Sequence, residues 1–100
     1  MFKKFLELQH NEETSRVGNK WLSEEDYKLL KEINDNKTFE DIALEHKRTI
    51  VGIKSRVISH ILYAQYKDGI KTIDELSYEY NIEKNLVEKY IRTINNNNAI

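Results

Sequence analysis

Apolar residues recur at intervals of three and four along most of the chain, the spacing that places side chains on one face of a helix. The pattern predicts helices at about 24–34, 39–46, 50–66, 73–80 and 83–94, and a short helix or arm over residues 2–9. Proline is absent and only three glycines occur, so little interrupts these segments. We therefore expect an all-α fold.

Capping signals mark the ends of the predicted helices. Ser23, Thr38 and Thr72 each precede acidic residues in a first helical turn, where a hydroxyl caps the backbone and carboxylates favour the helix dipole. Thr49 caps the helix at 50–66 in the same way. Gly69 closes that helix, because glycine readily adopts the left-handed conformation common at helix ends.

The chain of 100 residues is long enough for one compact domain, or two very small ones sharing a core. We expect an N-terminal arm and linker at 1–20, a three-helix unit at 21–66, a helical pair at 67–95 and a disordered tail at 96–100. A helix-turn-helix needs a small residue on its first helix where the second crosses closely. Ala43, with Ile53 on the next helix, meets that need.

The helix at 50–66 carries two apolar stripes, which indicates burial on two sides. One stripe is Ile53, Val57 and Ile61, and the other is Val51, Ile58 and Leu62. The helical pair that follows is the natural cover for the second stripe, and a homodimer partner is the alternative. In both cases only the first two turns of the helix stay accessible.

Charge is unevenly distributed, although the total is only -1. Residues 46–71 contain six basic residues and one acidic residue, between two acidic ends. A localised positive segment suits a surface that faces phosphates, and the alternative is a solvated helix face. Cysteine is absent, no apolar run is long enough to span a membrane, and the start is a poor signal peptide. We expect an intracellular protein with no membrane partner.

Two segments resemble Myb/SANT helix-turn-helix domains. Residues 21–26 read Trp-Leu-Ser-Glu-Glu-Asp, similar to the family's Trp-(Ser/Thr)-x-Glu-Glu-Asp opening with one extra residue after the tryptophan. Ile42-Ala43, followed by Arg48-Thr49 and then Gly52-Ile53 and Arg56, resembles its Ile-Ala and Arg-Thr-x-x-Ala-Ile-x-x-Arg ending. The likeness covers about residues 20–66. It extends to small Myb-like proteins of large DNA viruses with AT-rich genomes, in which case the location would be the host cell or virion.

The resemblance implies that the helix at 50–66 enters the major groove of double-stranded DNA. It assigns phosphate contacts to the turn and base contacts to the helix; the DNA-binding residues would be Lys47, Arg48, Thr49, Val51, Lys54, Ser55 and Ser59. Arg56 is expected to pair with Glu25 or Glu32 instead. Val51 and Ile58 are apolar where the family usually has polar readers, so Val51 is either a thymine contact or a packing residue. His46, in the turn, is either a phosphate contact or solvated.

The sequence offers no catalytic constellation. It contains no glycine-rich phosphate loop, its three histidines do not stand at metal-ligand spacing, and its acids cluster at helix starts. We expect no enzyme activity, no cofactor and no metal. The predicted function is DNA binding, as a transcriptional regulator or a genome-associated factor. The alternative is a SANT-like module for protein interaction or dimerisation, which the acidic ends and the apolar positions Val51 and Ile58 favour.

Overall fold

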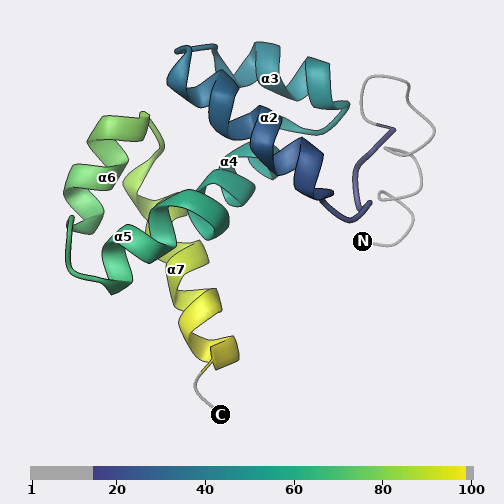
Figure 1. The fold of residues 1–100 in the computed structure, drawn as a ribbon. Helices are drawn as coiled ribbons and strands as arrows, with labels where there is room; N and C mark the ends of the chain where they lie inside the picture. The colour runs from purple at the N-terminus through teal and green to yellow at the C-terminus, as the bar shows by residue number, and fades with distance from the viewer. Residues whose placement is uncertain (1–14, 99–100) are drawn as a thin grey trace. The chain divides into compact units, whose positions relative to one another are not determined.

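The computed structural model describes residues 15–98 and confirms an all-α fold for that part of the chain (Figure 1). The short helix or arm predicted over residues 2–9 lies outside the described residues. The helices are α2 (Ser23–Asn34), α3 (Phe39–His46), α4 (Ile50–Val57), a π-helical turn η2 (Ile58–Leu62), α5 (Tyr63–Lys67), α6 (Ile73–Tyr80) and α7 (Lys84–Asn98). None of these helices has the length and apolar character that a membrane span needs.

The chain divides into two compact units, Met1–Ile53 and Lys54–Ile100. The division falls inside α4, earlier than the boundary expected at residue 66. In the first unit, α2 packs on α3, and the side chains of Leu29, Ile42 and Ile53 are completely buried. Ala43 is 5% exposed. The small residue that the helix-turn-helix pattern requires is therefore part of this core.

Three of the four predicted hydroxyl caps are confirmed, at Thr38, Thr49 and Thr72. Thr38 accepts a hydrogen bond from the backbone N–H of Asp41. Thr72 forms a complete capping box, because its side chain accepts from the Glu75 N–H while the Glu75 carboxylate accepts from the Thr72 N–H. The prediction for Ser23 is wrong, since α2 begins one residue earlier than expected and its N-cap is Leu22, which offers no side-chain acceptor.

Four helices end in the same way, with one residue in the left-handed conformation. These residues are Asn36, Lys47, Gly69 and Asn81, with φ values of 60°, 56°, 72° and 54°. At each end the N–H of the next residue bonds back to a carbonyl five residues earlier, as in Ile70 to Gln65 at 2.9 Å. This is the Schellman arrangement, which satisfies carbonyls left open at a helix end. It confirms the predicted role of Gly69.

Helical conformation continues without a break over residues 50–67, one residue beyond the predicted end. The turn at Ile58–Leu62 is π-helical, with a wider hydrogen-bonding pattern than the α-helix on either side. Ile58 and Leu62 are both completely buried in it. Both residues belong to the second predicted apolar stripe, which the helical pair that follows was expected to cover.

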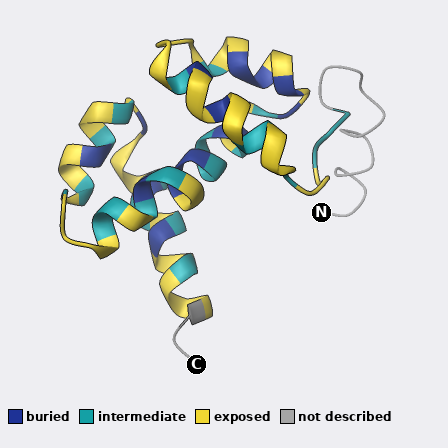
Figure 2. Cartoon of the chain, viewed as in Figure 1, coloured by how far each residue is buried: buried dark blue, intermediate teal, exposed yellow. Residues whose placement is uncertain are grey.

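In the second unit, α7 packs on both η2 and α6, so the predicted helical pair covers the second apolar stripe at η2. Its core includes Ile58, Leu62, Leu76, Val87 and Ile91, each at most 3% exposed. Figure 2 shows buried and intermediate positions along the first half of α7 and mostly exposed positions toward its C-terminal end. The helix runs to Asn98, past the predicted end at 94 and into the segment expected to be a disordered tail.

Candidate nucleic-acid interface

The turn between α3 and α4 consists of residues 47–49, and Lys47 is its exposed residue. Its backbone lies in the left-handed region at φ 56°. The N–H of Lys47 donates to the Leu44 carbonyl and that of Arg48 to the Ala43 carbonyl, at 3.2 and 3.0 Å. A non-glycine residue pays a steric cost in this conformation. Lys47 therefore occupies a strained backbone position, and its side chain is accessible to solvent.

Thr49 caps the start of α4, as the sequence predicted. Its hydroxyl oxygen accepts a hydrogen bond from the Gly52 N–H at 3.0 Å, which satisfies one of the backbone donors at the helix start. The Thr49 hydroxyl is thus engaged in capping, and the residue is only partly exposed.

Arg48 does not lie on the surface, and its expected contact with DNA phosphate is wrong for this conformation. The residue is 6% exposed. Its Nε and Nη2 atoms donate to the Glu25 carboxylate at 2.8 and 3.0 Å, and Nη1 donates to the Arg16 carbonyl at 2.9 Å. The guanidinium also lies over the Trp21 ring, 4.3 Å from its centroid. Arg48 therefore ties the turn to α2 and to the segment that precedes it.

Glu25 is the centre of this buried network. Besides Arg48, its carboxylate contacts Arg16 Nη2 and His46 Nδ1, each at 3.1 Å. Burial raises the pKa of Glu25, but hydrogen bonds from Arg48, His46 and Arg16 and the charge of Arg48 together outweigh it and lower the pKa to about 2. An acid on this helix was expected to pair with Arg56. The arginines that Glu25 contacts are Arg48 and Arg16.

His46 is 4% exposed, so the expectation of a phosphate contact or a solvated ring is wrong. Its Nδ1 faces Glu25 at 3.1 Å and its Nε2 faces Glu32 Oε1 at 2.5 Å. The ring also lies 5.7 Å from that of Trp21, centroid to centroid. Glu32 is 3% exposed, and among the described residues its Oε2 has no hydrogen-bond partner. Lys37 Nζ, at 4.0 Å, offers Oε2 an ion pair beyond hydrogen-bonding distance.

The sequence carried a signal for this network that the prediction did not use. Glu25 and Glu32 are seven residues apart, which is two helical turns, so they lie on one face of α2. Leu29, between them at the four-residue interval, is completely buried. Two acids flanking a core residue on one helical face require buried hydrogen-bond donors, which His46 and Arg48 supply.

The predicted base-contacting residues on α4 differ in their accessibility. Val51 is 53% exposed, so the packing interpretation of this residue is not supported. Ser55 is partly exposed, and Ser59 is exposed with its hydroxyl donating to the Arg56 carbonyl at 3.3 Å. The Lys54 side chain is 16% exposed, and its Nζ donates to Glu83 Oε1 at 2.7 Å.

Ion pairs neutralise much of the positive segment at 46–71. Arg48 is paired with Glu25, Lys54 with Glu83, and Lys71 with Glu79. Lys47 and Lys67 are exposed. The cationic surface of this segment is therefore smaller than its formal charge of +5 indicates.

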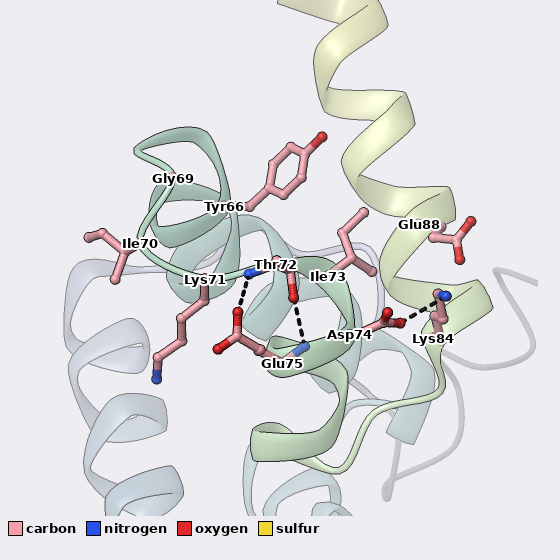
Figure 3. Close-up of a pocket in the computed structure, with 10 residues that line it drawn as sticks. All are labelled: Tyr66, Gly69, Ile70, Lys71, Thr72, Ile73, Asp74, Glu75, Lys84 and Glu88. Atoms are coloured by element: carbon pink, nitrogen blue, oxygen red, sulfur yellow. Dashed lines mark hydrogen bonds and ion pairs between the residues drawn. The ribbon is translucent and has the colours of Figure 1, made fainter.

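A hollow of about 550 Å³ lies on the second unit, between the end of α5, the start of α6 and the start of α7 (Figure 3). Its lining is Tyr66, Gly69, Ile70, Lys71, Thr72, Ile73, Asp74, Glu75, Lys84 and Glu88. Polar groups here contact one another, through the Thr72–Glu75 capping box and an ion pair of 2.8 Å between Lys84 and Asp74. Across the described residues, no cluster of histidine and acidic side chains is arranged to hold a metal ion.

No protein-family model matches the sequence, and neither the curated proteins nor the solved structures contain a match. The interpretation of the α3–α4 segment therefore rests on its own residues and their contacts.

Proposed function

We propose that the chain binds double-stranded DNA through the turn at 47–49 and the accessible face of α4. The observation that carries this proposal is Lys47, a lysine that the α3–α4 turn presents to solvent from a left-handed backbone position. Strain of this kind is concentrated at functional positions. A lysine beside a capped helix start is also well placed to contact a phosphate.

The accessible face of α4 supplies the remaining contacts. Val51, Ser55 and Ser59 are spaced by four residues, so they follow one side of the helix. Val51 suits a thymine methyl group, and the serine hydroxyls suit several base edges. Arg48 stabilises the turn from within by holding Glu25, and it is not part of the contact surface.

Titration of a labelled duplex, followed by fluorescence anisotropy over a range of salt concentrations, tests this proposal. With few accessible cations, the logarithm of the affinity should fall against the logarithm of salt concentration with a slope of about -2 to -3. A single unit with this few contacts should bind weakly, in the range of non-specific complexes of about 10⁻⁴–10⁻⁶ M. Absence of binding even at low salt would contradict the proposal.

A protein-interaction or dimerisation module is the second candidate, and exposed apolar side chains favour it. Leu22, Tyr27, Leu30 and Leu44 of the first unit are between 43% and 75% exposed. Large exposed apolar residues of this kind are enriched where proteins meet. Light scattering separates the candidates, because a stable homodimer that ignores DNA at low salt supports the second and excludes the first.

A further inference from the structure

Lys54 is held by a carboxylate at the start of α7. Its ammonium donates to Glu83 Oε1 at 2.7 Å, across 29 positions of sequence. Glu83 directly precedes α7, and its carbonyl accepts the N–H groups of Leu86 and Val87 at 3.0 and 3.1 Å. These backbone bonds fix Glu83 at the helix start, so its side chain is presented to Lys54 from an anchored position.

The two partners differ in exposure. The Lys54 side chain is 16% exposed, whereas that of Glu83 is 58% exposed. The hydrogen bond from Lys54 is the main cause that lowers the pKa of Glu83, so the carboxylate is ionised near neutral pH. The ion pair is therefore open to solvent on the Glu83 side, and solvent weakens ion pairs.

We propose that Glu83 is an intramolecular competitor of DNA, occupying the Lys54 ammonium until a duplex displaces it. This inference rests on the proposed function, in which Lys54 lies on the DNA-contacting helix. A carboxylate oxygen, a phosphate oxygen and the acceptor edge of guanine all bind the same ammonium donors. Glu83 therefore lowers the affinity for duplexes in general, both by holding Lys54 and by placing a negative charge beside the bound backbone.

Glu83→Gln removes the negative charge and keeps the size of the side chain. It also leaves the backbone hydrogen bonds to the carbonyl of residue 83 in place. We expect the variant to bind a labelled duplex about fivefold more tightly at low salt, the factor set by the strength of a partly exposed ion pair. Its salt dependence should steepen by about one unit of slope, since one more cation contributes to binding.

Glu79→Gln is the matched control. It removes one negative charge from the same unit and breaks a comparable ion pair, that of Glu79 with Lys71. Glu79→Gln should change the affinity by less than twofold. Lys54→Met provides the second control, because Glu83→Gln should give no more than the Glu79→Gln effect when Lys54 is absent. Urea midpoints for each variant establish that the fold is kept.

Three outcomes of these binding measurements test whether Glu83 competes with DNA for Lys54. A gain specific to Glu83→Gln that disappears with Lys54→Met supports competition. Equal affinities for Glu83→Gln and Glu79→Gln, with the unaltered chain binding DNA, would overturn the inference and leave the proposed function standing. Failure of every variant to bind duplex at low salt would overturn both.

Discussion

Arg48 and Glu25 form a bidentate salt bridge, in which Nε and Nη2 of the guanidinium donate to the two carboxylate oxygens at 2.8 and 3.0 Å. The side chains are 5% and 9% exposed. Parallel bonds of this kind are stronger and more directional than single ones. Arg48 therefore stabilises the fold from a buried position, whereas Lys47, its neighbour in the sequence, is exposed.

Replacing Arg48 should destabilise the fold. Arg48→Ala leaves a buried carboxylate without its main partner, so the free energy of unfolding should fall by about 3–5 kcal/mol. Arg48→Lys should recover only part of the lost free energy of unfolding, because a lysine cannot reproduce the bidentate geometry or the planar contact with Trp21. Urea denaturation followed by the fluorescence of Trp21, the single tryptophan, measures the loss. Unchanged stability of Arg48→Ala would contradict the buried network.

Stability should fall in acid because of Glu25. A pKa lowered from 4.5 to about 2 means that the unfolded state takes up a proton first as the pH falls. The stabilisation by Glu25 is complete above about pH 4.5 and is lost progressively between about 4.5 and 2. Urea midpoints of the unaltered chain and Glu25→Gln should therefore differ most near neutral pH and converge toward pH 2. A constant difference over that range would refute the assignment.

Lys47→Gly tests the backbone strain in the α3–α4 turn. Glycine adopts φ 56° without the steric cost that a side chain pays, so the variant should gain about 0.5–1 kcal/mol. For a chain of this size the midpoint of thermal unfolding should rise by about 2–8 °C. Gly69→Ala is the reverse control. It imposes φ 72° on a side chain with no atom within 4 Å of the new Cβ, so its loss of stability reports backbone strain alone.

The hydroxyl caps should differ in their energetic contributions. Thr38→Ala and Thr72→Ala each remove a hydrogen bond to a helix start and should cost about 1 kcal/mol. Ser23→Ala should change the stability by less than about 0.5 kcal/mol, because Ser23 is the first helical residue and makes no cap. Urea denaturation of the three variants distinguishes them. If Ser23→Ala lost as much stability as Thr38→Ala and Thr72→Ala, Ser23 would be a helix cap after all, which would contradict this prediction.

Local rules predicted much of the fold. The bounds of α3 and α6 follow from Thr38 and Thr72, whose caps depend on residues within one helical turn. The end at Gly69 is equally local, as it depends on the conformational freedom of one residue. Ser23 misled the prediction because the same residue type also suits the first helical position. The π-helical turn at Ile58–Leu62 was not predicted, because the apolar spacing there was interpreted as part of one continuous α-helix over 50–66.

The interface was harder to predict, because charge in a sequence does not reveal burial. Arg48 and Lys47 are equivalent as basic residues in a turn, yet one is 6% exposed and the other lies on the surface. What separates them is the carboxylate of Glu25, 23 residues away in the sequence. The partner of Lys54 is equally remote, since Glu83 directly precedes α7 and lies 29 positions away in the sequence.

A matched pair of lysine variants tests the central claim most directly. Lys47 and Lys67 are both exposed, and replacing either with alanine removes one positive charge. Only Lys47 belongs to the proposed interface. Duplex-binding anisotropy should show Lys47→Ala about fivefold weaker at low salt, with a salt slope shallower by about one unit. Lys67→Ala should stay within twofold of the unaltered chain. Equal affinities for the two variants would contradict DNA binding through the α3–α4 turn.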